Sequence, residues 1–343
     1  MTAERLRVIG WMSKPEMDWL EVRKGEYRAF ASAQTAIRAT SRLLDYLDRL
    51  DVQLEDFGID QALLGDTIVL RGHKIRGKAK TLPVPAGELA ETYRDQMRRI
   101  NVWLATLDIA SEWDADGNPR DVGKRWMYRV FNNGSIEQGG RLYGGFWLDM
   151  SGEDRLGDIR LEGESVVSLD YGQCGIRIAY ALAGVQPPPG DLYQVPGLEG
   201  CRAGVKKVLN AQLCRTGEMR RLPAHSRKHF PADLAYAHIE ELILRHHQPL
   251  RAAFCRAQGL THQFIDSQVT VDCLLTLAAQ GLAALPVHDG LLAPRSVASR
   301  VAQVMLDSFR KITGVEGVVS GTTSQGEFPL PPTSSDLTPE LFM

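Results

Sequence analysis

The 343-residue sequence lacks several features that would place a protein in a class at once. No run of 18 apolar residues occurs, so we expect no transmembrane helix and no membrane partner. The residues up to Trp19 contain no continuous apolar stretch and predict neither a signal peptide nor an anchor. The five cysteines form no CxxC pair, which argues against a disulfide scaffold or zinc site and favours a cytoplasmic protein with reduced thiols.

Neither sign of charge dominates the sequence. Lys and Arg number 40, Asp and Glu number 42, and the formal net charge is −2. This balance excludes a uniformly basic coat for nucleic acid, but basic residues cluster locally. Residues 202–228 hold eight Lys or Arg and one acid, and residues 71–80 hold five and no acid. Such clusters attract phosphate groups, although an isolated one is more often a solvated face.

The composition, with 44% hydrophobic and 24% charged residues, is that of a globular protein. Apolar spacing near 3.6 residues predicts helices over 28–50, 86–107, 174–184, 200–214, 232–257, 264–280 and 296–312. Residues 164–171 (ESVVSLDY) predict a buried strand, and residues 282–294 (LAALPVHDGLLAP) predict a β-hairpin. The stretch 64–85 is a hairpin or a basic loop, and the turn-rich residues 113–123 are expected to form a boundary.

Two aspartates stand at the ends of apolar strands, Asp170 in VVSLDYG and Asp289 in LPVHDGLL. A carboxylate in such a place is costly unless it faces water, a cation or a metal. Two of them brought together would repel each other, and each would be hard to ionise without a divalent cation between them. Alone, each aspartate is more often a turn residue. We hypothesise that the two aspartates act as a pair, because two such oxygen ligands suit Mg²⁺ and phosphoryl transfer.

A basic stripe is expected on the helix over 200–214. Arg202, Lys206, Asn210 and Cys214 are spaced four apart, so they follow one slowly drifting face. Arg and Lys at this spacing repel each other unless an anion lies beside them. A triphosphate would supply that anion, with the guanidinium as a fork and the ammonium as a point charge.

Together these segments resemble the family A DNA polymerases and the related phage-type single-subunit RNA polymerases. The first palm motif of the family reads D-Y-S-Q-x-E-x-R, and residues 170–177 read DYGQCGIR. The last palm motif reads V/I-H-D, and residues 287–289 read VHD. The fingers motif has R-x3-K, matched by Arg202 and Lys206, and then Y-G, where residues 214–215 read CR.

Two further segments carry the resemblance. Residues 140–143 (GRLY) resemble the segment that contacts the duplex at the primer terminus. Residues 264–268 (FIDSQ) resemble the F-V-H-S-Q helix of the RNA polymerases. Each segment alone is weak, but the five occur in the order of the family and extend over residues 132–313.

The resemblance implies how the reaction would be supported. Asp170 and Asp289 would hold two Mg²⁺ ions, for which Mn²⁺ can substitute, with the carbonyl of Tyr171 as a further ligand. Arg202 and Lys206 would bind the incoming triphosphate, and Lys206 would also protonate the leaving pyrophosphate.

The resemblance also implies contacts with DNA. Arg141 and Gln268 would contact the minor groove at the growing end, and His288 would support the primer end. The expected partners are a DNA template with its primer or nascent strand, nucleoside triphosphates, and a helicase or accessory subunit.

The sequence departs from the family at three places in or beside the implied nucleotide site. Tyr171, Gly175 and Cys214 belong to that implied site. At the position of Gly175 the DNA polymerases have a glutamate that excludes a ribose 2′-hydroxyl, whereas the RNA polymerases have glycine. Cys214 and Arg215 replace the tyrosine and glycine of the fingers, which removes a stacking surface. Gly290 stands where the DNA enzymes have glutamate.

The fold that the resemblance implies is α+β, a polymerase palm of antiparallel sheet and helices with helical fingers and a small helical N-terminal region. Residues 1–130 would form a reduced thumb or template-binding module, too short for a proofreading nuclease and a full thumb. Residues 131–320 would form the palm, with the fingers inserted at about 190–262, and residues 321–343 a loose tail.

The expected activity is template-directed addition of nucleoside triphosphates to a 3′-hydroxyl by two-metal catalysis. Gly175 favours an enzyme that tolerates ribonucleotides and is similar to a primase or RNA polymerase. The alternatives are a minimal family A DNA polymerase without proofreading, a terminal transferase, and a catalytically weak nucleic-acid-binding replication protein that kept the fold.

Overall fold

The computed structural model describes residues 3–23, 36–51, 65–111 and 120–331. Contacts divide the chain into two units. One comprises Met1–Gly65 with Glu112–Arg120, and the other comprises Asp66–Ser111 with Asp121–Met343. Residues 66–111, which the sequence placed in an N-terminal module, thus belong to the same unit as the expected palm.

The first unit holds a short antiparallel sheet between two helices in its described residues. β1 (Leu20–Arg23) pairs with β2 (Ala36–Ala39), so that Leu20 lies opposite Ala39. α1 (Ala3–Met12) precedes the sheet in the chain, and α2 (Ser41–Arg49) follows it.

The helix predicted over 28–50 is therefore wrong at 36–39, where the backbone pairs with β1. The helix starts only at Ser41, because the Thr40 hydroxyl accepts a hydrogen bond from the backbone N–H of Leu43 and caps the first turn. Residues 28–35 lie outside the described residues.

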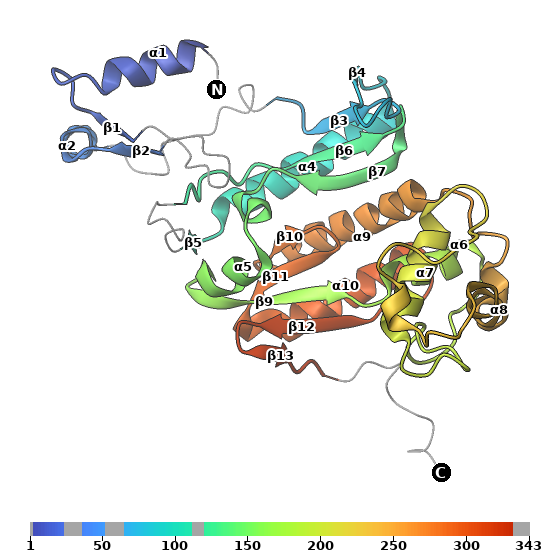
Figure 1. The fold of residues 1–343 in the computed structure, drawn as a ribbon. Coiled ribbons are helices and arrows are strands. Elements are labelled where there is room, and N and C mark those ends of the chain that lie inside the picture. The colour runs from blue at the N-terminus through green and yellow to red at the C-terminus, as the bar shows by residue number, and fades with distance from the viewer. Residues whose placement is uncertain (1–2, 24–35, 52–64, 112–119, 332–343) are drawn as a thin grey trace. The chain divides into compact units, whose positions relative to one another are not determined.

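An antiparallel sheet forms the centre of the second unit (Figure 1). Its order is β10-β11-β9-β12-β13, and β8 pairs with the first residues of β9 and with β5. The strands are β5 (Ile109–Ser111), β8 (Ile159–Leu161), β9 (Glu164–Tyr171), β10 (Leu285–Val287), β11 (Gly290–Pro294), β12 (Val319–Thr323) and β13 (Gly326–Phe328).

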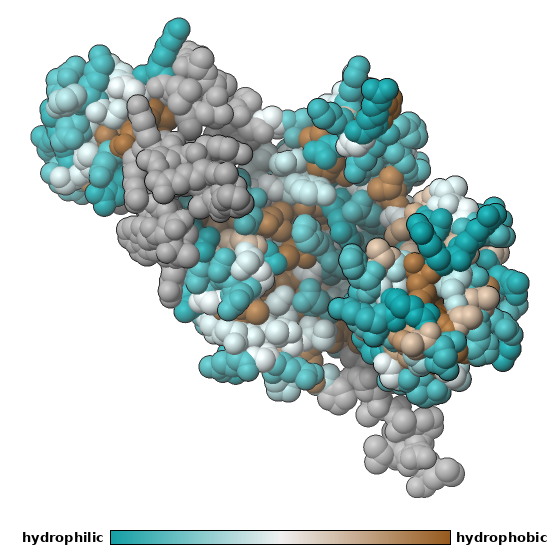
Figure 2. Space-filling view, in the orientation of Figure 1, coloured by the Kyte–Doolittle hydropathy of each residue, from teal (hydrophilic) through white to brown (hydrophobic). Residues whose placement is uncertain are grey.

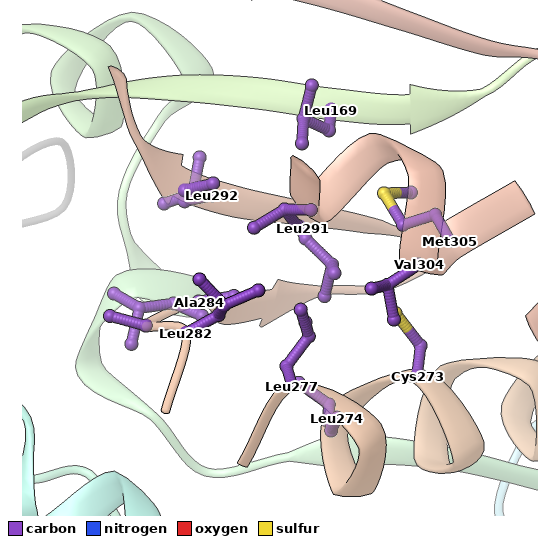
Figure 3. Packing of buried hydrophobic residues seen from close by; sticks show 14 of the residues in the cluster. Leu169, Cys273, Leu274, Leu277, Leu282, Ala284, Leu291, Leu292, Val304 and Met305 are labelled. Atoms are coloured by element: carbon purple, nitrogen blue, oxygen red, sulfur yellow. The ribbon is translucent and has the colours of Figure 1, made fainter. Parts of the chain in front are cut away.

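β9 is the strand predicted over 164–171, and it pairs with both β11 and β12. Its alternation sends Val167 and Leu169 into the core and leaves Asp170 exposed. Figure 3 shows Leu169 and Leu291 from the strands in one cluster with Leu277 of α9 (Gly259–Ala279). The cluster also contains residues of α10 (Ala298–Thr313). The two helices thus form the apolar support beneath the acid-bearing strand.

A second sheet in the same unit has the order β4-β3-β6-β7. β3 pairs with β6 in parallel, and the other two pairings are antiparallel. The β3–β4 pairing confirms the hairpin alternative for residues 64–85. The elements are β3 (Ile68–Arg71), β4 (Thr81–Leu82), β6 (Tyr128–Asn132), β7 (Ser135–Tyr143) and the predicted helix α4 (Glu88–Thr106), whose Tyr93 stacks on Phe131 of β6.

Three helices form a separate apolar cluster at the end toward which β9 runs (Figure 1). They are α6 (Cys174–Leu182), α7 (Arg202–Cys214) and α8 (Tyr236–His246). Of these, α7 and α8 lie within the segment expected to form fingers, at about 190–262, whereas α6 precedes it. The helix predicted over 232–257 is wrong at both ends, since α8 ends at His246 and a short 3-10 turn with Pro249 follows.

The remaining helical elements are short. α5 (Gly152–Asp158) begins after Ser151, whose hydroxyl accepts from the N–H of Asp154. Turns of 3-10 helix occur at Phe146–Asp149, Arg227–His229, Gln248–Leu250 and Arg295–Val297.

The structure differs from the loose tail expected from Gly321 onward. Residues through Phe328 form β12 and β13, and Gly321 lies opposite Phe328. A side chain at Gly321 would approach the Cβ of Phe328 to 3.1 Å, so the pairing uses the absence of one. Residues 332–343 lie outside the described residues.

The α+β class predicted from the sequence is confirmed by these antiparallel sheets and their helices. No helix in the described part of the chain is both long enough and apolar enough to cross a membrane.

Candidate active site

Two carboxylates from separate parts of the chain meet on the central sheet. Asp170 is the penultimate residue of β9, and Asp289 lies with His288 in the turn between β10 and β11. β11 pairs with β9 so that Gly290, the residue after Asp289, lies opposite Asp170. The predicted hairpin and strand therefore bring the two predicted acids together through backbone pairing.

The surroundings of Asp170 disfavour its charged form. Asp170 is exposed as a whole residue, but the protein around its carboxyl group removes water from it, and this desolvation raises the pKa of Asp170. A hydrogen bond from the Ser168 hydroxyl (3.1 Å) and the Arg155 cation lower this pKa, and the Asp289 charge raises it. Arg155 projects from α5 and is held by the Met150 carbonyl at 2.7 Å. The sequence did not single out Arg155, because only the packing of α5 beside β9 brings it near the acid.

The glycine after Asp289 is required by the close approach of the two strands. A Cβ at Gly290 would lie 2.6 Å from both Asp170 Oδ1 and the Leu169 carbonyl oxygen. No side chain fits there unless β9 moves. A glycine at this position is thus built into the pairing that places the acids.

The donor set fits a hard divalent cation that binds together with a phosphate ligand. Tyr171 is buried and its hydroxyl donates to the Met305 carbonyl at 2.6 Å, so only its backbone is available as a ligand. No group of three or more His, Cys, Asp and Glu in the described residues forms a metal cage. Mg²⁺ is commonly held by one or two carboxylates plus substrate phosphates, and the mutual repulsion of Asp170 and Asp289 favours such a cation.

A cleft of about 270 Å³ reaches Asp289, whereas Asp170 lies outside its lining. Four predicted site residues, Arg141, Gly175, Cys214 and Asp289, lie in its lining. The full lining is Arg141, Cys174, Gly175, Ile178, Asn210, Leu213, Cys214, Gly259, His262, Gln263, Asp266 and Asp289. A Cβ at Gly175 would meet no heavy atom within 4 Å, so this wall of the cleft is open.

A buried acid that the sequence did not assign lies in the same cleft. Asp266 of α9 is 3% exposed, and Nε and Nη2 of Arg141 both donate to its Oδ2, at 3.1 and 3.0 Å. The Cys174 thiol donates to the other oxygen at 3.8 Å. Burial raises the pKa of Asp266 to about 7, although the Arg141 cation opposes this shift. Its signal in the sequence was an aspartate at the histidine place of the F-V-H-S-Q segment.

Arg141 is therefore fixed in the cleft wall before any ligand binds. Burial opposes the charged form of its guanidinium, but Asp266 and Asp289 together raise the pKa of Arg141. An arginine held in this way presents its remaining N–H groups in defined directions.

Of the two cations in the basic stripe of α7, Arg202 has an ion-pair partner and Lys206 has none within the described residues. Arg202 forms an ion pair with Asp191, and its guanidinium carbon lies 5.3 Å from the centre of the Tyr193 ring. The ammonium of Lys206 is exposed and makes no hydrogen bond or ion pair within the described residues. Asn210 and Cys214, further along the same face, line the cleft. The stripe thus leads from solvent to the cleft.

Lys207 faces another direction. Its ammonium donates to the His225 carbonyl and contacts Nε2 of His229, both at 3.2 Å. These contacts hold the segment after α7 against the helix, which distinguishes Lys207 from Lys206.

Two predicted DNA-contacting residues lie outside the lining of the cleft. Gln268 is half-buried, and its amide donates to the Tyr93 hydroxyl at 3.1 Å while its carbonyl accepts from Arg129 at 3.4 Å. His288 is exposed in the turn with a φ of 55°. Partial burial first, and then the Arg141 cation, lowers the pKa of His288.

No family model matches the sequence, and no curated protein matches it. Among solved structures, the POL domain of Pol1 from M. smegmatis, in complex with DNA primer-template and dNTP, is similar to this chain with a TM-score of 0.36 and 14% sequence identity. The similarity covers 68% of this chain and 51% of that chain, so the chain spans about half the length of that domain. No function of this chain is inferred from that likeness.

Proposed function

We propose that the chain is a template-directed nucleic acid polymerase, a nucleotidyltransferase that adds nucleoside triphosphates to a 3′-hydroxyl. The observation that carries the proposal is the pairing of Asp170 with Asp289, which itself lines a cleft together with Gly175 and Cys214. Paired carboxylates suit a cation that binds with a triphosphate, and the open cleft offers room for the nucleotide.

In the proposed reaction the 3′-oxygen attacks the α-phosphorus while the bond from that phosphorus to the bridging oxygen breaks, and pyrophosphate leaves. The two aspartates would hold Mg²⁺, which when bound stabilises charge on the attacking and leaving oxygens. The residues of the chain mainly position the reactants and supply electrostatics.

The α7 residues would manage the triphosphate. Lys206 has an ammonium without a protein partner in the described residues, so it is available to bind the phosphates and to protonate the leaving pyrophosphate. Arg202 would exchange Asp191 for the triphosphate, or bind it while keeping that ion pair.

Nucleic acid would be held beside the nucleotide. Arg141, already oriented by Asp266, would donate to the minor groove of the primer–template duplex. Gln268 would have to release Tyr93 and Arg129 before it could do the same, so it contributes less. His288, exposed in the turn next to Asp289, would support the primer end.

Gly175 bears on which nucleotides the proposed polymerase accepts. The space beside it is open, so no side chain presses on the sugar of a nucleotide bound there. We infer an enzyme that tolerates ribonucleotides, in the manner of a primase or RNA polymerase, rather than a strict DNA polymerase.

The decisive test is extension of a primed DNA template in Mg²⁺, with wild type and with Asp170→Asn and Asp289→Asn. We expect each variant to lose about 10³-fold or more in rate, because the cation loses a ligand. Asp307→Asn, which removes an exposed acid from α10, is the matched control and should extend normally.

Thermal unfolding of the same variants shows whether the fold is kept. Because the environment of Asp170 disfavours its charge, Asp170→Asn should unfold at the wild-type temperature or higher in metal-free buffer. Near-normal extension by either acid variant would overturn the proposal. Binding of DNA by a wild type that never extends it would favour the catalytically weak binding protein instead.

A further inference from the structure

The segment between β3 and β4 is an ordered hairpin, called here the basic hairpin (residues 71–80). The Gly72 amide donates to the Lys80 carbonyl at 2.9 Å, and Ile75 and Lys78 exchange backbone hydrogen bonds of 2.8 and 3.1 Å. Between them Arg76 and Gly77 have φ values of 49° and 80°, as a tight hairpin turn requires. The backbone therefore holds its side chains in a defined arrangement.

All five cations of the basic hairpin are exposed, and none has a side-chain hydrogen bond or ion pair within the described residues. The segment contains no acid, and Asp66 just before β3 is bound by Arg94 at 2.7 Å. The five are Arg71, Lys74, Arg76, Lys78 and Lys80. Like charges gathered on one short hairpin repel each other, so a polyanion that bound there would relieve the repulsion.

The tip of the hairpin also offers an apolar contact. Ile75, beside the turn, is 74% exposed, the highest value among the exposed large hydrophobic residues of the described chain. A small anion has no apolar surface on which this isoleucine side chain could pack. Sugar and base faces of nucleic acid provide both phosphates for the cations and apolar surface for this side chain.

The basic hairpin is part of the sheet that carries the cleft residue Arg141. β3 pairs with β6, β6 pairs with β7, and Arg141 lies on β7. The Gly134 amide in the β6–β7 turn donates to the Arg71 carbonyl at 2.9 Å, which joins the base of the hairpin to that turn. In Figure 2 hydrophilic residues dominate the projection formed by β3 and β4.

We propose that the basic hairpin is a second nucleic-acid contact surface, outside the cleft, that binds the sugar–phosphate backbone. The Lys and Arg side chains contact phosphates, and Ile75 packs on a sugar or base. The choice of nucleic acid among polyanions rests on the proposed polymerase function, whereas the requirement for a polyanion rests on the hairpin itself.

The test measures binding of a fluorescein-labelled DNA duplex by anisotropy over a series of salt concentrations, without nucleotide. The variant is Lys74→Ala/Arg76→Ala/Lys78→Ala in the full chain. We expect at least about tenfold weaker binding at 0.1 M salt and a salt slope reduced by about 0.9 for each phosphate that the variant no longer neutralises. The control, Arg300→Ala/Arg310→Ala/Lys311→Ala, removes three charges from α10, two of which are ion-paired with Glu316 and Asp272, and should bind as wild type.

A second variant separates the apolar contact from the ionic ones. Ile75→Ser should weaken binding several-fold at every salt concentration and leave the salt slope unchanged, because it removes no cation from the surface. An Ile75→Ser variant that binds as wild type would remove the isoleucine from the contact.

Several outcomes would overturn the inference. Wild-type affinity and slope in the triple hairpin variant would show that the surface is only solvated. An equal effect of the triple variant on binding of polyglutamate would overturn the assignment to nucleic acid. Hairpin-dependent DNA binding by a chain that never extends primers would keep this inference and remove the proposed function, so the two can fail separately.

Discussion

At the scale of single residues, Gly290 and Gly175 differ in the space that surrounds them. Gly290 has no room for a side chain, because Asp170 and the backbone of Leu169 lie 2.6 Å from where its Cβ would be. Gly175 has nothing within 4 Å of that position. The first glycine permits the pairing of the acids, and the second leaves a wall of the cleft open.

The open wall at Gly175 leads to a prediction about the sugar of the nucleotide. A glutamate there would press on the 2′ position, so wild type should discriminate between ribonucleotides and deoxyribonucleotides by about tenfold or less, equivalent to about 1.4 kcal/mol. Gly175→Glu should shift the ratio toward deoxyribonucleotides, as a tight wall does. Single-nucleotide incorporation on a primed DNA template measures the ratio.

Gly157→Glu is the control for that experiment, since it adds the same charge at an exposed helical glycine outside the cleft lining. Rejection of ribonucleotides by wild type, at about a thousandfold, would contradict the prediction and favour the minimal DNA polymerase.

At the scale of elements, the register of α7 decides which lysine serves the nucleotide. Lys206 shares a face with Asn210 and Cys214, which line the cleft, while Lys207 is bound to the segment containing His225 and His229. Adjacent helical residues differ by about 100° in direction, so only one of the two lysines can follow the stripe.

We expect Lys206→Ala to lower the rate of nucleotide addition about 100-fold, because it removes a phosphate ligand and a proton donor. Lys207→Ala should lower the rate much less. Pre-steady-state incorporation at saturating nucleotide, with a melting curve for each variant, makes the comparison. Equal losses in the two variants would show that the helix presents a different face to the nucleotide.

At the scale of the whole molecule, buried titratable groups oppose each other in the pH dependence of stability. Burial lowers the pKa of His247, in the cluster of α6 to α8, and of His262, in α9, to about 4. The Tyr180 hydroxyl and the Leu192 carbonyl satisfy the ring of His247. The stability that these neutral histidines contribute is fully present above their ordinary pKa of 6.5 and is lost as the pH falls toward 4.

Asp266 acts in the other direction. Burial raises its pKa from 3.8 to about 7, so the folded chain keeps a proton that the unfolded chain has released. Its contribution to the free energy of unfolding therefore increases as the pH falls from 7 toward 4. In wild type this gain offsets part of the loss from the histidines.

Removing the carboxyl should expose the effect of the histidines. We expect Asp266→Asn to lose about 2 kcal/mol more stability than wild type between pH 7 and pH 5, measured by urea unfolding at both values. Asp307→Asn, at an exposed acid, should follow wild type. If Asp266→Asn and wild type lose the same stability, Asp266 is already ionised in the folded chain at pH 5.

Local patterns in the sequence were sufficient for several elements. The strand over 164–171, the helix α4 and the hairpin that carries Asp289 follow from apolar periodicity and turn residues. Two of the failures share one cause, whereas the helix over 232–257 fails at a 3-10 turn with Pro249. Residues 36–39 and 321–328 are strands because they pair with distant or neighbouring backbone, and such pairing leaves little signal in a short polar segment.

In the candidate site, too, some features follow from local sequence patterns and others from contacts between distant segments. The sequence by itself determined which acids end apolar strands and which cations share a helix face, because strand alternation and helical periodicity act over a few residues. Only the tertiary structure decided that Asp266 and Arg155 join the site, that Gln268 is held outside it, and that Gly290 cannot bear a side chain. Those outcomes depend on how separate elements pack, and packing is a property of the folded whole.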